Sequence, residues 1–172
     1  RVLAAEPGRV NEVDEQGDSA LLYAAHEGDL PMVTELLSTK GIAVNLGDNN
    51  GNTACHIAAA NGHEAIVRAL AEHGADVNKQ TNKGDTPLCF ASLMGHESTA
   101  RCLLSLGALP EIPGAPAELQ PESTSPERQP EADASPRPAC HAAAAYGHEA
   151  IVIALAEHGA DVNKQNIHGG TP

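Results

Sequence analysis

Histidine and cysteine are the residues of this chain with the most obvious capacity for chemistry. The sequence contains nine histidines and four cysteines, and the dipeptide Cys55-His56 occurs again as Cys140-His141. Thiolate and imidazole groups are the ligands that zinc prefers, at distances of about 2.0–2.3 Å. These four side chains could share a zinc ion only if the elements that carry them bring them together.

Those elements are repeated along the chain. GHEAIVRALAEHGADVNKQ, from Gly62 to Gln80, returns as GHEAIVIALAEHGADVNKQ, from Gly147 to Gln165. Weaker copies begin at Gly28 and Gly95, which gives a period near 33 residues (95 minus 62). A period of about 20–50 residues is typical of units that bury their apolar face only by stacking on their neighbours.

Each unit contains signals for two short helices. In the third unit, Thr86 is a good N-cap, Pro87 is tolerated at the first helical position and Gly95 is suited to a helix end. His96 opens a second helix with apolar residues at helical spacing, and Gly107 closes it. The segment between units is rich in Gly, Asp and Asn and predicts an extended hairpin. The predicted core consists of small side chains in the first helices and aliphatic ones in the second: Ala24, Ala25, Ala58, Ala59, Ala91, Ser92, Ala143, Ala144, Ile66, Val67 and Leu70.

The segment from Gly51 to Asn78, GNTACHIAAANGHEAIVRALAEHGADVN, matches the pattern GxTPLHxAAxxGHxEIVxLLLxxGADVN at most fixed positions. The chain therefore resembles the ankyrin repeat family. The resemblance implies an all-α solenoid of stacked helix-turn-helix units with hairpin loops. Both ends of the sequence interrupt a repeat, so we expect a piece of a longer array. The repeats are assigned as a partial tail at 1–13, full repeats at 14–47, 48–80 and 81–110, a displaced repeat at 137–165 and a truncated stub at 166–172.

Stacking argues against the zinc site. The two Cys-His pairs occupy the same register two units apart, and each step along the stack is a helix-packing distance of about 8–10 Å. We therefore expect no metal site, and the histidines to be structural. The cysteines are better suited to a core in a reducing compartment than to disulfides, which favours a cytoplasmic or nuclear location. No nucleophile with a nearby base is evident, so we expect neither a catalytic site nor a cofactor.

Composition restricts the partners. The net charge of −13 argues against nucleic acid, whose binding needs Lys and Arg to neutralise phosphates, and favours a basic protein partner. No run of apolar residues is long enough to enter a membrane. Only 2% of the residues are aromatic, so we expect an aliphatic core. We also expect the chain to be a monomer.

The segment 111–136 interrupts the repeats. It is rich in Pro, Glu and Ser and is predicted to be disordered, because it contains too few apolar residues to offset its ordering entropy. It could be a neutral spacer, a gene-model artefact or a regulatory segment phosphorylated at Ser125 or Ser135, both of which precede proline. Pro138 stands where a helix cap belongs. The next helix is thus expected to start late or to be capped from Ser135, and the junction to be the least stable point of the stack.

The resemblance also implies a binding surface, the concave face made by the hairpin tips and the exposed side of the first helices. Asn49 and Asn82 fall on it, and the face changes along the stack from acidic through Asn-rich to apolar. The chain is predicted to be an adaptor or scaffold; the alternatives are the regulatory segment of a larger enzyme, such as a kinase or ubiquitin ligase, and the cytosolic array of a channel or cytoskeletal linker. The predicted partner-binding residues are Asp18, Asn50, Asn52, Asn61, Lys83, Asp85, Leu93, Met94 and Tyr146.

Overall fold

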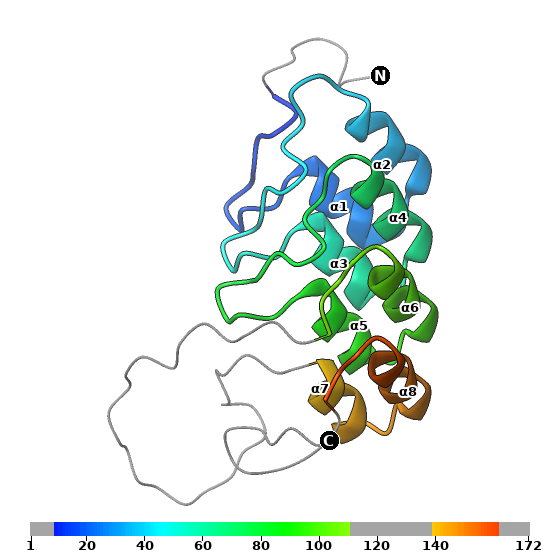
Figure 1. Cartoon of the computed structure of the whole chain (residues 1–172). Helices are drawn as coiled ribbons and strands as arrows, with labels where there is room; N and C mark the ends of the chain where they lie inside the picture. Colours follow the sequence, from blue (N-terminus) through cyan, green and yellow to red (C-terminus); the bar gives the residue numbers. More distant parts are fainter. Residues whose placement is uncertain (1–8, 111–138, 162–172) are drawn as a thin grey trace, which may run out of the picture.

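The computed structural model describes residues 9–110 and 139–161. These residues form eight α-helices in four antiparallel pairs, and the described ranges contain no β-strand beyond two isolated bridges (Figure 1). The pairs are α1 (Ala20–Glu27) with α2 (Leu30–Leu37), α3 (Ala54–Ala60) with α4 (Glu64–Glu72), α5 (Pro87–Met94) with α6 (Glu97–Ser105), and α7 (Ala139–Ala145) with α8 (Glu149–Glu157).

The helix pairs stack in one direction. The first helices α1, α3, α5 and α7 contact one another in sequence, and the second helices α2, α4, α6 and α8 do the same. The hairpins between pairs project from the side of the stack where the first helices lie (Figure 1). The predicted all-α stacked architecture is confirmed.

The helix signals operate as predicted. The Thr86 side chain accepts a hydrogen bond from the Cys89 backbone N–H at the start of α5, and Gly95 ends that helix with φ 77°, in the left-handed region that glycine adopts most easily. At the start of α3, the Thr53 hydroxyl and backbone N–H both bond His56 Nδ1, at 2.9 and 3.1 Å. The same capping position therefore uses two different side-chain arrangements.

The core is aliphatic and small. Ala25, Ala58, Ala91 and Ala143 are fully buried along the first helices, so consecutive helices approach closely. The second helices contribute larger side chains, and the predicted Ile66, Val67 and Leu70 are all buried. Of the predicted core residues, only Ala144 is partly exposed.

The fourth pair occupies the same register as the others despite the interruption before it. α7 is already helical at Ala139, the equivalent of Ala54 in α3, so the expectation of a late helix start is wrong. Packing supplies the reason: Ala139, Cys140 and Ala143 are buried in the common core, and α7 packs against α5. The predicted disorder of 111–136, the cap at Ser135 and the stub at 166–172 lie outside the described residues.

Candidate protein-binding face

Three hairpins and the exposed side of the first helices form one surface, which we call the hairpin face. Each hairpin is closed by a backbone hydrogen bond across its turn. The bonds run from Asp14 N to Asp18 O (3.1 Å), from Asp48 N to Asn52 O (3.0 Å), and from Thr81 N to Asp85 O (2.9 Å). The resemblance to ankyrin repeats implied a binding surface made of these same elements.

Neighbouring hairpins are tied together at their tips. Asn49 donates from its backbone N to Gln16 O (3.2 Å) and from Nδ2 to Glu15 O (3.0 Å). One repeat further along, Asn82 donates in the same way to Asn50 O (2.9 Å) and Asn49 O (3.0 Å). Asn49 and Asn82 were expected to face a partner, but their amides are bonded within the stack. The sequence could have indicated this, because the two asparagines recur one period apart.

A second ladder joins the loops that follow the second helices. Asn45 donates from Nδ2 to Gly74 O (3.2 Å) and accepts from Asp76 N (2.8 Å). Asn78 makes the equivalent bonds to Gly107 O (3.1 Å) and from Leu109 N (2.8 Å). The first three repeats are therefore linked to one another at both edges of their loops, so their hairpins form a preorganised surface.

Two further asparagines of the predicted binding set bond within their own repeat. Asn52 Nδ2 donates to Asp48 Oδ2 (2.8 Å), and Asn61 Nδ2 donates to Ile57 O (2.9 Å). Asn50 lies exposed at its hairpin tip, and a hydrogen bond from its side chain to Asp48 helps to lower the pKa of that carboxyl group. All three amides therefore bond within the chain, and Asn50 and Asn61 are the two that lie exposed.

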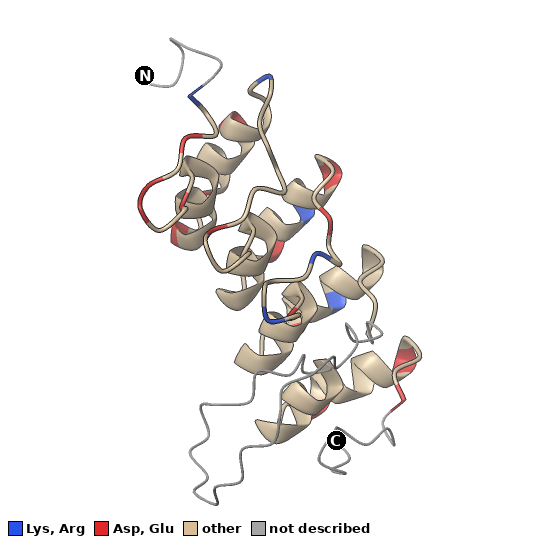
Figure 2. Ribbon diagram, turned by 90° about the vertical axis from the view of Figure 1, so that its left-hand side faces the viewer, with Lys and Arg blue, Asp and Glu red and all other residues tan. Residues whose placement is uncertain are grey.

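The first repeat is the acidic end of the hairpin face. Asp14, Glu15 and Asp18 lie on its hairpin, and Asp48 begins the next one; Figure 2 shows acidic residues on these hairpins and lysine on the third. Partial burial, together with the nearby carboxylates of Asp14 and Asp48, raises the pKa of Asp18. Negative charge is thus concentrated at this end.

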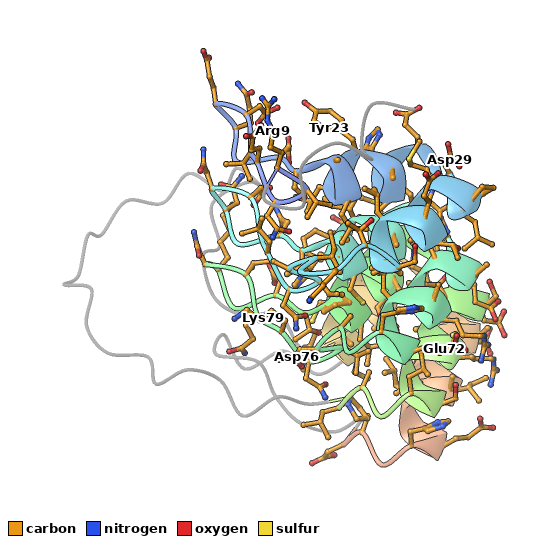
Figure 3. All side chains as sticks on the ribbon, turned by 90° about the horizontal axis from the view of Figure 1, so that it is seen from above. Arg9, Tyr23, Asp29, Glu72, Asp76 and Lys79 are labelled. Carbon is orange, nitrogen blue, oxygen red and sulfur yellow. The ribbon has the colours of Figure 1, made fainter. Side chains whose placement is uncertain are left out.

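Tyr23 is a residue of this face that the sequence reasoning missed. Its side chain is 54% exposed, and its hydroxyl donates a 2.7 Å hydrogen bond to Asp14 Oδ2. That bond lowers the pKa of Asp14 and raises the pKa of Tyr23. In Figure 3, Tyr23 points outward on a different side of the stack from Glu72 and Asp76. Its equivalents in the next two units are Ile57 and Phe90, which would have indicated an apolar row on the first helices.

The third and fourth repeats form the apolar end. Met94 is 54% exposed and Tyr146 is 60% exposed, as expected of binding residues, whereas Leu93 is only partly exposed. The Tyr146 ring stacks against His148 at a centroid distance of 6.4 Å, and His148 Nε2 donates to Leu93 O (3.2 Å). The stack thus brings Met94 and Tyr146 to neighbouring repeats of one surface, although segment 111–136 separates them in sequence.

The third hairpin carries the predicted residues Lys83 and Asp85. Lys83 is exposed at the tip, and Asp85 is partly buried. The Asp85 carbonyl accepts a 3.2 Å hydrogen bond from His56 Nε2 of the preceding repeat. The backbone of Asp85 therefore has a structural role in addition to any role in binding.

Cys55 and His56, the first of the two Cys-His pairs, are both buried in α3. Burial lowers the pKa of His56 to about 4 and raises the pKa of Cys55 to about 12. The imidazole is therefore neutral and the thiol protonated at pH 7. Within residues 9–110 and 139–161, no three His, Cys, Asp or Glu side chains are grouped as metal ligands would be. None of the helices in these ranges has the length and apolar character to span a membrane.

Comparisons with known proteins agree with this architecture. A family model of three ankyrin repeats matches residues 1–81, 21–113 and 79–166. The ankyrin repeat-containing protein ITN1 of Arabidopsis thaliana is 46% identical over 66 residues, which are 37% of this chain and 11% of that relative. The chain thus corresponds to a small part of the relative's length. The matched repeats and the stacked helix pairs together show that this chain belongs to the ankyrin repeat family.

Proposed function

We propose that this chain is an adaptor or scaffold that holds a partner protein against the hairpin face. Ankyrin repeats are generally protein–protein interaction modules. The observation that carries the proposal is the exposure of two large apolar side chains, Met94 and Tyr146, on adjacent units of this face. Exposed aromatic and methionine side chains are typical of residues that dominate binding energy.

The charge of the chain restricts the partner in this proposal. At −13 overall, the protein attracts basic surfaces and repels phosphate backbones, so the partner is a protein and not a nucleic acid. We also propose that the chain acts as a monomer in the cytoplasm or nucleus. The same face would serve if these repeats were the regulatory segment of a larger enzyme or the cytosolic array of a channel or cytoskeletal linker.

The test compares two apolar surfaces of the same chain. The double variant Met94→Glu/Tyr146→Glu places charge on the hairpin face, and Ile153→Glu places it on α8 of the second-helix column, where Ile153 is 48% exposed. Proteins that cross-link to the unmodified chain in native cells should be lost with the double variant and retained with Ile153→Glu, while both variants keep the helical circular dichroism. Retention with the double variant, or equal loss with Ile153→Glu, would show that the hairpin face is not the binding surface.

A further inference from the structure

We infer that the partner segment on the hairpin face is itself polarised, with an arginine side chain against the first repeat and apolar side chains against the third and fourth repeats. This inference rests on the proposed function and specifies the chemistry of the partner. It is carried by the exposed apolar row of the first helices and by the distribution of charge along the hairpins beside it.

The apolar row consists of exposed and partly exposed side chains of the first helices. At one end it begins with Tyr23, and at the other it ends with Met94 and Tyr146. Two more members, Ile57 and Phe90, are partly exposed between them. The helices that carry these side chains, α1, α3, α5 and α7, contact one another in turn. A segment lying along the row would meet all four repeats.

Within the described part of the chain, the carboxylates near Tyr23 are not paired with a Lys or Arg. Asp14, Glu15, Asp18 and Asp48 form no ion pair there with Lys or Arg, and the nearby Arg9 is paired with Glu12 at 2.9 Å. Asp14 and Asp48 accept hydrogen bonds within their own repeats, but among the described residues no Lys or Arg neutralises the carboxylates of the first two hairpins. A basic side chain is the complement to this end.

Tyr23 favours arginine over lysine as that side chain. Its hydroxyl is bonded to Asp14, so the ring is held beside a carboxylate while more than half of the side chain is exposed. A guanidinium group is planar and can stack on an aromatic ring while it donates hydrogen bonds to a carboxylate. The ammonium group of lysine acts as a point charge. It is less suited to stacking on the Tyr23 ring while it also bonds a carboxylate.

The opposite end suits apolar side chains. Met94 offers a flexible thioether and Tyr146 a ring that stacks on His148, and Leu93 next to Met94 in sequence is partly exposed. Burying Met94 and Tyr146 under an aliphatic or aromatic side chain removes apolar surface from water. The position equivalent to Tyr146 in the second repeat is Asn61, whose amide is bonded to its own helix. Large apolar side chains at this position are therefore found in the third and fourth repeats and not in the second.

The geometry of the stack sets the spacing within the partner. Two helix-packing steps of about 8–10 Å each separate α1 from α5, and a third step reaches α7. An extended chain advances about 3.3 Å per residue. The arginine and the first apolar anchor should therefore be about five or six residues apart, and the second anchor about seven to nine residues from the arginine.

The probe is a random dodecapeptide library displayed on phage and selected against the whole immobilised chain. We expect the enriched peptides to carry arginine and an aliphatic or aromatic residue at this spacing. Synthetic peptides made from the enriched sequences are then measured by fluorescence anisotropy. Glu15→Gln/Asp18→Asn, which leaves the Asp14 hydrogen bonds intact, should weaken binding about tenfold and reduce its salt dependence. Tyr23→Leu should weaken arginine peptides more than their lysine versions.

The matched control removes the same two charges from the second-helix column. Glu35→Gln/Glu72→Gln alters exposed carboxylates of α2 and α4 and should leave affinity within about twofold, because a distant exposed charge is largely screened. Peptides that depend on Met94 and Tyr146 but show no arginine preference and no loss with Glu15→Gln/Asp18→Asn would overturn this inference and leave the proposed function standing. A selection that enriches no peptide sensitive to Met94→Glu/Tyr146→Glu would overturn both.

Discussion

His148 donates from its Nε2 atom to the carbonyl oxygen of Leu93, 3.2 Å away and 55 residues earlier in the chain. The same bond joins His96 to Ala60 O at 3.0 Å, and His63 to His26 O at 3.4 Å. The fourth helix pair therefore docks on the third with the geometry of an uninterrupted stack. Continuity in this protein is maintained by contacts between repeats and does not depend on a fixed spacing along the chain.

The first prediction is that the position of the His148 ring restricts residue 95 to glycine. Gly95 and its equivalent Gly147 both have positive φ, 77° and 73°. A Cβ on Gly95 would lie 2.5 Å from the His148 ring, whereas no described atom lies within 4 Å of a Cβ on Gly147. Both substitutions to alanine should cost about 1–2 kcal/mol for the left-handed backbone. Gly95→Ala should cost about 1 kcal/mol more, because the imidazole must leave Leu93 O.

Urea unfolding of the two variants measures this difference. A His148→Ala background provides the control, since Gly95→Ala should then cost no more than Gly147→Ala. Equal losses for the two glycines in the unmodified chain would show that the contact between Gly95 and His148 does not restrict the side chain at position 95.

The buried His56 predicts a dependence of stability on pH. Burial lowers its pKa to about 4 in the folded chain, from the ordinary value of 6.5. Between these values the unfolded chain binds the extra proton, so the free energy of unfolding should fall as the pH is lowered from 6.5 to 4, by about 3 kcal/mol in total for this group. His56→Gln should be less stable at pH 7 but should lack this part of the slope. Parallel curves of unfolding free energy against pH for the two proteins would contradict the assignment.

Cys55 should be a probe of unfolding. Burial raises the pKa of its thiol from 9.0 to about 12, so its reactive thiolate is about a thousandfold scarcer at pH 8 than that of a free cysteine. Mass spectrometry should find Cys55 unmodified by iodoacetamide in the folded protein and fully alkylated in urea. Rapid alkylation of Cys55 without denaturant would mean that α3 opens locally.

The junction before α7 is predicted to be the least stable point of the stack. α3 and α7 form a matched pair, with sequences ACHIAAA and ACHAAAA. α3 is preceded by the Thr53 cap, whereas Pro138 precedes α7. Hydrogen exchange should therefore be faster for the amides of α7 than for those of α3. Equal protection would show that packing on α5 compensates for the different junction.

A loop graft tests whether segment 111–138 is needed for docking. Replacing residues 108–138 with the sequence of Ala75 to Thr86 supplies a threonine N-cap before Ala139. The free energy of unfolding should rise by about 1 kcal/mol, the usual value of such a cap. The grafted chain should keep the helicity of α7 and α8 by circular dichroism. Loss of that helicity would mean that the natural segment itself supports the fourth repeat.

Much of the fold could be predicted from the sequence because its signals are local. The Thr86 cap, the helix end at Gly95 and the apolar spacing of Ile66, Val67 and Leu70 each act within one or two helical turns. The repeat period then required stacking. One of the two alternatives for α7, a late start, was wrong: the local signal at Pro138 is poor, but α7 is helical from Ala139 and packs on α5.

The binding face was less predictable because it depends on contacts between repeats. The exposed positions of Met94 and Tyr146 followed from helical periodicity. The roles of Asn49 and Asn82 did not, since an amide at a hairpin tip can face a partner or the next hairpin, and only the separation of the hairpins decides which. Tyr23 was missed because its exposure and its bond to Asp14 depend on how the first hairpin folds against α1.

The sequence by itself determined that this protein is a stack of ankyrin repeats with small residues between the first helices. Apolar spacing and helix caps are local signals, since each depends on residues close together in the chain. Only the tertiary structure decided that His148 docks the fourth pair on the third through Leu93 O, and that the amides of Asn49 and Asn82 bond to the neighbouring hairpins. Those outcomes depend on distances between residues far apart in the chain. Such distances are fixed by the packing of one helix pair on the next.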